Sequence, residues 1–245
     1  MRSRTRAIAA SDGPSWQPSP VMRPYEISST VKQRALKTRG RIGSLDSIDA
    51  RRSALVVVDM QNHFVGPGFS AAAPAARTVA PAINRMASKM RASGGLVVWI
   101  QTSAAQSLRE WRNHHEFNMT PEQAKTRLRS LAEDAEGFLL HPDMQVAASD
   151  LWVKKTHYSA FIGRSSNLDA ALRARGVHTL LISGTVTNVC CESCARDAMM
   201  LDYRVAMLSD GCAAWTNEEH VASLDTFVLF FGDVLTVEQA IARIE

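Results

Sequence analysis

Three side chains capable of covalent or acid–base chemistry each stand close behind a short apolar segment. They are Asp59, Lys155 and Cys190. Polar residues at the carboxyl ends of buried parallel strands are how an open α/β sheet builds a site. If the three groups meet there, the thiol would be a nucleophile, the carboxylate its base, and the ammonium group a positive charge that stabilises both.

Cys190 ends the run Gly184-Thr185-Val186-Thr187-Asn188-Val189-Cys190, which predicts a tight turn from a strand into a helix. A helix N-terminus favours the thiolate, the nucleophilic form of cysteine. Backbone N–H groups of such a turn can converge on an oxyanion. The alternative is that Cys190 is a small buried apolar residue, as most free cysteines are.

Asp59 is the candidate general base, because a carboxylate at a buried strand end must be paired or hydrogen-bonded. Lys155 is the candidate partner, since an ammonium group nearby keeps Asp59 charged and lowers the pKa of a thiol. Lys154 would face the other way on an extended strand. The alternatives are a helix-capping or loop-ordering aspartate and surface lysines.

The elements that must position these residues alternate along the chain. Strands are predicted at 54–58, 96–101, 151–154, 179–183 and 205–208, and helices at 29–37, 75–93, 121–131, 167–175, 189–202, 218–230 and 237–244. Short strands rich in Val, Ile and Leu are typical of parallel strands buried on both faces. The alternation predicts an α/β fold, a three-layer α/β/α sandwich with a mostly parallel sheet. Residues 103–150 are predicted to cover the strand ends.

The chain has 245 residues, of which 46% are hydrophobic and 21% charged, as in an ordinary globular protein. No apolar run approaches the roughly 18 residues of a membrane span, and no secretory signal is evident. Three of the four cysteines crowd into 190–194. They do not form a disulfide framework, so we expect a reducing, cytoplasmic location and no membrane partner.

The positive charge is concentrated in residues 1–52, which hold 11 Lys and Arg against 4 Asp and Glu. We interpret 1–52 as a basic, partly flexible N-terminal arm and 53–245 as the folded α/β domain. Such an arm packs on a neighbouring subunit or binds an anionic partner. Without a recognised nucleic-acid motif, no nucleic-acid partner is expected.

The histidines do not have the spacing of a zinc site, so neither a metal nor another cofactor is expected. His114 and His115 are adjacent and cannot easily share one ion. Cys191 and Cys194 form half of a zinc or redox motif whose second half is missing.

Three ordered motifs resemble the isochorismatase-like cysteine hydrolase superfamily over about residues 53–235. The first is Val57-Val58-Asp59-Met60-Gln61-Asn62-His63-Phe64, the second is Lys155-x-x-x-Ser159-Ala160-Phe161, and the third runs from Gly184 through Cys190 to Ala198. The superfamily includes nicotinamidases, N-carbamoylsarcosine amidohydrolases and ureidoacrylate amidohydrolases.

The resemblance implies a six-stranded sheet, a homodimer or homotetramer, and an Asp-Lys-Cys triad of Asp59, Lys155 and Cys190. It also implies a cis peptide between Val186 and Thr187, which would aim the Thr187 N–H beside that of Cys190 into an oxyanion hole. The Asp-x-His metal cluster of nicotinamidases is missing after residue 101, which disfavours that activity. Arg164 replaces a small hydroxyl residue, and we leave open whether it meets an acidic substrate or a neighbouring subunit.

The sequence and the resemblance together indicate a metal-independent amidohydrolase of a small carboxamide or N-carbamoyl (ureido) compound, acting through a thioester. The alternatives are a vinyl-ether or ester hydrolase on the same scaffold and a non-catalytic oligomeric binding protein. Cys190 argues against vinyl-ether cleavage, because isochorismatases proper lack that cysteine. Candidate substrate-lining residues are Gln61, Phe64, Trp111, His115, Tyr158 and Val186, each of which the core or an interface explains equally well.

Overall fold

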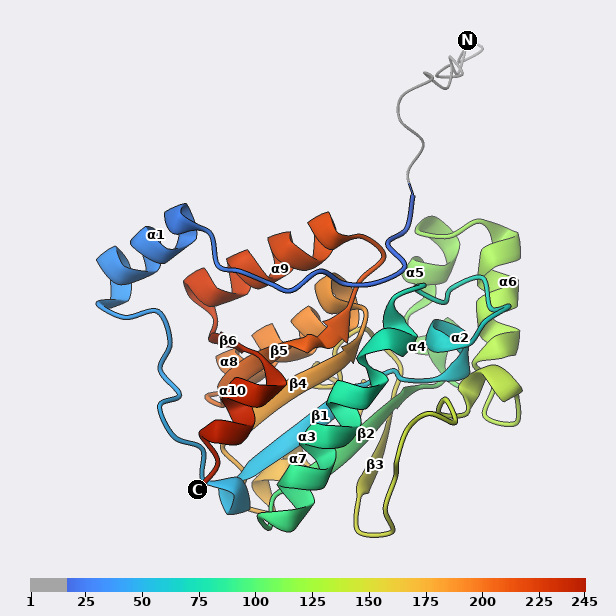
Figure 1. Ribbon diagram of the computed structural model, residues 1–245. Helices are drawn as coiled ribbons and strands as arrows, with labels where there is room; N and C mark the ends of the chain where they lie inside the picture. The colour runs from blue at the N-terminus through green and yellow to red at the C-terminus, as the bar shows by residue number, and fades with distance from the viewer. Residues whose placement is uncertain (1–16) are drawn as a thin grey trace, which may run out of the picture.

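The computed structural model describes residues 17–245, and within them the chain forms one six-stranded sheet with helices on both faces (Figure 1). The strands are β1 Ser53–Val58, β2 Leu96–Thr102, β3 Leu151–Lys155, β4 Thr179–Thr185, β5 Arg204–Ala213 and β6 Asp233–Leu235. Their order across the sheet is β3-β2-β1-β4-β5-β6, and every neighbouring pair is parallel. The predicted α/β sandwich is confirmed, with an all-parallel sheet.

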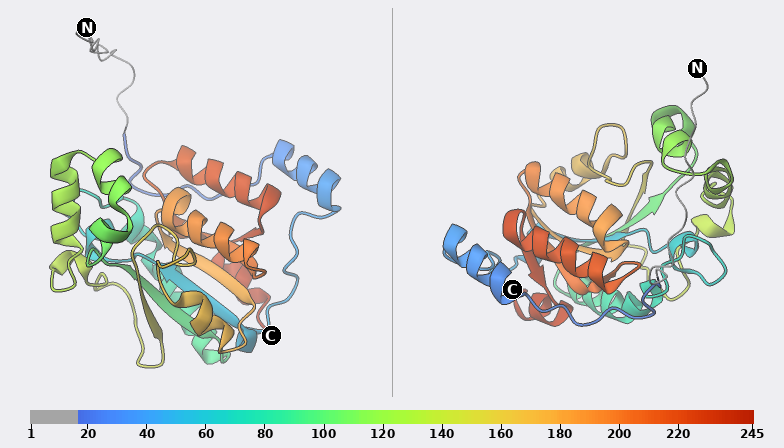
Figure 2. Two further views of the ribbon diagram at one scale, coloured as in Figure 1. Left: turned by 180° about the vertical axis from the view of Figure 1, so that it is seen from behind. Right: turned by 90° about the horizontal axis from the view of Figure 1, so that it is seen from above.

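The helices that connect the strands complete three layers (Figure 2). They are α1 Ser29–Arg39, α2 Asn62–Val65, α3 Ala80–Ala92, α4 Ser107–Glu110, α5 Arg112–Phe117, α6 Pro121–Ser130, α7 Leu168–Arg173, α8 Glu192–Met200, α9 Asn217–Phe230 and α10 Val237–Ala242. Helical turns of other kinds lie at Ala50–Arg52, Ala76–Val79, Glu136–Phe138 and Thr187–Cys191.

Alternating side chains of each strand fill two cores, one on each face of the sheet. In β1, Leu55 and Val57 pack with α3 and α10, whereas Val56 and Val58 pack with α7, α8 and α9. A strand buried on both faces carries apolar residues at every position, which explains why β1 is apolar from Ala54 to its end.

The short helices α2, α4, α5 and α6 cluster beyond the carboxyl ends of the central strands (Figure 1). Helix α6 begins with a capping box in which Thr120 and Gln123 bond to each other's backbone. These helices correspond to the predicted cover and place their side chains over the strand ends.

Two predicted boundaries at the start of α8 are wrong. Strand β4 continues two residues past Ser183, because Gly184 and Thr185 remain paired with β5. The helical segment then begins at Thr187 with a π-turn and becomes α-helical at Glu192. Cys190 therefore lies in a π-turn rather than in the first turn of an α-helix.

The described part of the predicted arm packs on its own chain. Ser19 N donates to Trp215 O at 2.7 Å, and Arg23 N donates to Asn217 Oδ1 at 2.7 Å. Helix α1 lies beside α9 (Figures 1 and 2). Residues 1–16, the rest of the arm, lie outside the described residues. No helix within 17–245 is long and apolar enough to cross a membrane.

Candidate active site

Asp59, Thr102 and Lys155 meet where three neighbouring strands end. Asp59 directly follows β1, and its N–H still donates to Ile100 O of β2 at 3.1 Å. Thr102 and Lys155 are the last residues of β2 and β3 and are partners in the sheet register. Because parallel strands end at the same edge, the register alone brings these side chains together.

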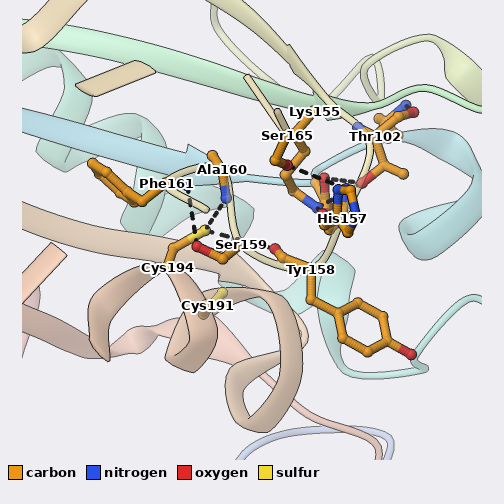
Figure 3. Close-up of polar contacts among 12 residues, drawn as sticks. Thr102, Lys155, His157, Tyr158, Ser159, Ala160, Phe161, Ser165, Cys191 and Cys194 are labelled. Atoms are coloured by element: carbon orange, nitrogen blue, oxygen red, sulfur yellow. Dashed lines mark hydrogen bonds and ion pairs between the residues drawn. The ribbon is translucent and has the colours of Figure 1, made fainter. Parts of the chain in front are cut away.

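The Lys155 ammonium joins this group through three contacts. Its Nζ lies 2.8 Å from Asp59 Oδ2, 2.7 Å from Thr102 Oγ1 and 3.0 Å from His157 O. Thr102 Oγ1 in turn donates to Asp59 Oδ1 at 2.9 Å. Figure 3 shows the ammonium directed at Thr102 and at the loop that carries His157. Asp59 and Lys155 thus form a buried, hydrogen-bonded ion pair.

One oxygen of Asp59 is available to take a proton. Its Oδ1 accepts the Thr102 hydroxyl, its Oδ2 lies 2.8 Å from Lys155 Nζ, and the Cys190 thiol forms a side-chain hydrogen bond with the carboxylate. Burial lowers the pKa of Lys155, but the negative charges of Asp59 and Cys190 raise it above its usual value. Lys155 therefore stays charged.

Cys190 lies against this pair and is almost closed to solvent, with 5% exposed. Burial raises the pKa of the Cys190 thiol, Lys155 lowers it, and Asp59 raises it again, with a net increase. The expectation that the lysine and helix end depress the thiol pKa is thus overridden by burial. In the free protein the sulfur keeps its proton and has a base beside it.

The predicted cis peptide is one residue away from its expected place. The non-proline cis bond joins Thr185 to Val186, not Val186 to Thr187. The cis bond directly follows Thr185, the last residue of β4. The Val186 carbonyl accepts the N–H groups of Val189 and Cys191 at 3.1 and 3.2 Å, which closes the turn around Cys190.

His220 of α9 is a hydrogen-bond partner of Thr187 in this turn. Its Nδ1 lies 2.8 Å from Thr187 Oγ1, and both residues are fully buried. Burial lowers the pKa of His220 to about 4, so the imidazole is neutral at neutral pH. The sequence motifs pointed to Thr187 but not to His220, which lies 33 residues further along the chain.

The cover contributes an aromatic wall that includes three predicted substrate-lining residues. The Trp111 ring stacks on His114 with centroids 3.9 Å apart, meets Tyr158 edge-on at 4.7 Å, and lies 6.3 Å from His115. Neither ring nitrogen of the buried His114 has a hydrogen-bond partner within 17–245. Burial raises the pKa of Tyr158 and the negative charge of Cys190 raises it further, so the two side chains lie within electrostatic reach of each other.

The other predicted lining residues have different surroundings. The Gln61 amide is occupied by backbone: Nε2 donates to Thr102 O at 3.1 Å and Phe138 O at 2.9 Å, and Oε1 accepts Thr102 N at 2.7 Å. Gln61 thus fixes the end of β2. Phe64 lies under the guanidinium of Arg127, 5.8 Å from Cζ to the ring centroid. Val186 is half-buried against the α3 core.

Cys191 and Cys194 contact backbone groups, and among residues 17–245 neither forms a hydrogen bond or ion pair with Asp59 or Lys155. Cys194 Sγ accepts the Ala160 N–H at 3.3 Å (Figure 3), and Cys191 lies behind the turn near Ser183 O. Arg164 is exposed. No group of three or more His, Cys, Asp or Glu side chains within 17–245 is arranged to hold a metal ion.

Besides His220, two residues near the site escaped sequence reasoning, Thr102 and Arg127. Thr102 stands directly behind a buried strand, as Asp59 does, and that placement is the signal that could have found it. Arg127 lies in a helix with other basic residues, and its position over the site comes only from the folded cover.

Comparison with known proteins places these motifs in a family. The isochorismatase domain model matches residues 53–239. A ureidoacrylate amidohydrolase of Variovorax paradoxus is 35% identical over 78% of this chain and 81% of its own length. One of Yersinia enterocolitica is 30% identical over 76% and 86%.

Solved structures share the fold. A cysteine hydrolase from Pseudomonas syringae superposes with a TM-score of 0.71 at 28% identity, covering 80% of this chain and 94% of its own. The N-carbamoylsarcosine amidase of Thermoplasma acidophilum has a TM-score of 0.59 at 26% identity, with 76% and 97% covered.

Proposed function

The chain belongs to the isochorismatase family and is a hydrolase of non-peptide C–N bonds, and within that reaction we propose that Cys190 is the nucleophile, Asp59 the general base and acid, and Lys155 their charge partner. The substrate is a small carboxamide or ureido compound, as the names of the two amidohydrolase relatives suggest. One observation carries the proposal: the buried Asp59–Lys155 ion pair stands beside a buried thiol on which both charges act.

The reaction follows from the protonation states. Asp59 takes the thiol proton as the Cys190 sulfur bonds to the substrate carbonyl carbon. The carbonyl oxygen becomes an oxyanion, for which the N–H groups of Thr187 and Cys190 are the proposed donors. The C–N bond then breaks, and Asp59 returns its proton to the departing nitrogen, which leaves as ammonia or an amine.

A second half-reaction restores the enzyme. Water gives a proton to Asp59 and attacks the thioester carbon, the C–S bond breaks, and the sulfur recovers a proton from Asp59. Lys155 remains charged throughout and keeps Asp59 from holding its proton permanently, because an adjacent cation favours the carboxylate. The Thr102 hydroxyl fixes Asp59 Oδ1, so that Oδ2 is the oxygen that exchanges the proton.

Ammonia release from a panel of small amides and ureido acids tests the assignment. We expect release by the native protein, none by Cys190→Ala, and release close to native by Cys212→Ala, a buried cysteine of β5 outside the ion pair. Mass spectrometry of acid-quenched enzyme should find the acyl group on the peptide that contains Cys190. Undiminished release by Cys190→Ala would contradict the nucleophile assignment.

The assembly and location are further parts of the proposal. We place the enzyme in the cytoplasm, which suits four cysteines that are all free. A homodimer or homotetramer is supported by large apolar side chains left exposed, among them Phe117, Trp152 and Phe230. Light scattering coupled to gel filtration gives the mass, and a monomer at micromolar concentration would contradict the oligomer.

A further inference from the structure

The first described residues of the chain cross the start of helix α9. Ser19 Oγ accepts two hydrogen bonds from Asn217, one from the backbone N at 3.2 Å and one from Nδ2 at 2.9 Å. Asn217 Oδ1 in turn accepts the Arg23 N–H at 2.7 Å, and Ser19 N donates to Trp215 O at 2.7 Å. Asn217, the first residue of α9, thus bonds to the arm through its backbone and through both polar atoms of its side chain.

The same part of the arm, which we call the strap (residues 19–25), also contacts the loop before α9 and the helix itself. Met22 Sδ accepts the Ala214 N–H at 3.5 Å, and Tyr25 OH donates to Asp225 Oδ1 at 2.8 Å. Burial and Asp225 raise the pKa of Tyr25, so its hydroxyl keeps the proton that it donates. Beyond Tyr25 the chain continues into α1, which lies beside α9 (Figures 1 and 2). The strap therefore fixes α9 at two points along its length.

Helix α9 in turn bonds to both ends of the segment that carries the nucleophile. His220 Nδ1 lies 2.8 Å from Thr187 Oγ1, at the start of the π-turn. Ser223 Oγ donates to Glu192 Oε2 at 2.7 Å, where α8 begins. Cys190 lies between these two attachments. The position of α9 therefore sets the position of the turn that presents the thiol.

The strap determines where α9 lies rather than whether the helix forms. Thr216 caps α9 by itself, because its Oγ1 accepts Glu219 N at 3.1 Å while Glu219 Oε2 accepts Thr216 N at 2.9 Å. Asn217 and His220 are three residues apart and lie within one helical turn, so a displacement of the first turn of α9 moves both. Loss of the strap should leave a capped helix whose His220 is no longer held at a fixed place.

We propose that Asn217 is a positioning residue through which the N-terminal strap holds α9, and with it the Thr187–Cys191 turn, in the arrangement that the reaction requires. A displacement of about 1 Å in a reacting group can lower a rate about 100-fold, so a distant attachment of this kind acts on catalysis. The strap precedes the matched isochorismatase domain, which begins at residue 53, and is thus an addition to that domain. The inference rests on the proposed roles of Cys190 and Thr187 and extends the active enzyme to the arm.

The substitution Asn217→Ala in the full-length chain tests the role of the strap. It removes the contacts of Oδ1 and Nδ2 with the arm and leaves the Thr216 cap in place. We expect kcat for ammonia release to fall about tenfold and KM to change by less than about threefold, because oxyanion donors act mainly on the transition state. Asn217→Asp keeps an acceptor for Arg23 N and can accept the Ser19 hydroxyl, so it should recover most of kcat.

Asn84→Ala is the matched control. The Asn84 side chain also joins two segments, since Nδ2 donates to Asp143 O at 2.8 Å and Oδ1 accepts Gln145 N at 2.9 Å. These contacts tie α3 to the loop before β3 and do not involve α9, so kcat should stay native. An equal fall of kcat in Asn84→Ala and Asn217→Ala would mean that any lost surface contact has this effect, and it would overturn the proposal.

Two measurements without turnover separate this inference from the proposed function. In Asn217→Ala, iodoacetamide should label Cys190 about 5- to 30-fold faster, and amide hydrogen exchange should accelerate in the peptide that contains Thr187–Cys191, because the turn opens more often. A purely stabilising strap would lower the melting temperature and leave kcat, labelling and exchange of the turn unchanged, which would overturn the proposal. If the native protein releases no ammonia while labelling and exchange respond as expected, the strap is supported and only the proposed function is contradicted.

Discussion

Lys155 Nζ and Asp59 Oδ2 are 2.8 Å apart in a pair whose side chains are 1% and 0% exposed. Such a pair is costly to bury and costly to break, because removing one partner leaves the other charge without compensation. Its presence under a thiol therefore has a functional explanation more readily than a stabilising one. Removing both partners should therefore abolish activity while costing less stability than removing one of them.

Lys155→Met is expected to lower the free energy of unfolding by roughly 3–5 kcal/mol, since Asp59 would remain charged and unpaired. The double change Asp59→Asn, Lys155→Met should regain most of that stability, because the buried charges are then gone. Neither protein should release ammonia. Urea denaturation measures the stability and the ammonia assay the activity. If the stability losses of Asp59→Asn and Lys155→Met alone add up to the loss in the double change, the two residues do not act as a unit.

Thr102→Val tests the hydroxyl that joins the two charges. It removes the donor to Asp59 Oδ1 and the acceptor for Lys155 Nζ while keeping nearly the same volume. We expect kcat to fall about 10- to 100-fold, as for loss of hydrogen bonds to charged groups. Thr102→Ser keeps the hydroxyl and should stay within about threefold of native. Equal kcat values for the two variants would leave Thr102 without a positioning role.

The reactivity of Cys190 should depend on pH in a defined direction. Burial and Asp59 raise the pKa of the thiol against the effect of Lys155, so the thiolate fraction is small at neutral pH and grows with pH. The rate of iodoacetamide labelling should increase from about pH 7 to about pH 10 without a plateau. Asp59→Asn removes one cause of the increase and should shift the curve to lower pH. A plateau below neutral pH in the native protein would mean that the thiolate already exists there.

His220 is expected to make the fold sensitive to acid. Its pKa is about 4 in the folded protein against 6.5 ordinarily, so below about pH 6.5 the unfolded chain takes up a proton that the folded one refuses. Stability is therefore complete above that pH and falls toward pH 4, by roughly 3 kcal/mol from this residue. His220→Gln should flatten that part of the pH–stability curve, measured by urea denaturation. An unchanged slope would show that the imidazole is already protonated when folded.

The sequence predicted side-chain positions best where a residue could be assigned to the end of a particular strand. Lys154 and Lys155 illustrate this, because strand alternation predicts that they face opposite sides. Lys154 pairs with Glu133 at the surface, and Lys155 is buried beside Asp59. The apolar segments and the helical segments between them were sufficient to predict the parallel sheet.

The rest of the site depends on tertiary contacts that no local pattern encodes. Arg127 is indistinguishable from its basic neighbours in α6 until the cover folds over Phe64. The sixth strand, Asp233–Leu235, is too short to stand out in the sequence. The cis bond follows Thr185, the last residue of β4 that pairs with β5, whereas the apolar run in the sequence ends at Ser183.

Gly184 supplies the last prediction, because it lets β4 approach β1 directly behind the nucleophile turn. Its φ is +113°, a region that other residues rarely adopt, and a Cβ there would lie 2.0 Å from Val58 O. Gly184→Ala must push apart the strands that carry Asp59 and Cys190, so we expect a loss of more than about 4 kcal/mol in unfolding free energy, or no folded protein. Gly40→Ala is the matched control: its φ is +70° but the space around it is open, so the cost should be near 1 kcal/mol, roughly that of the strained backbone alone. Thermal denaturation of both proteins decides the matter, and similar melting temperatures for the two variants would show that β1 and β4 separate easily at this point.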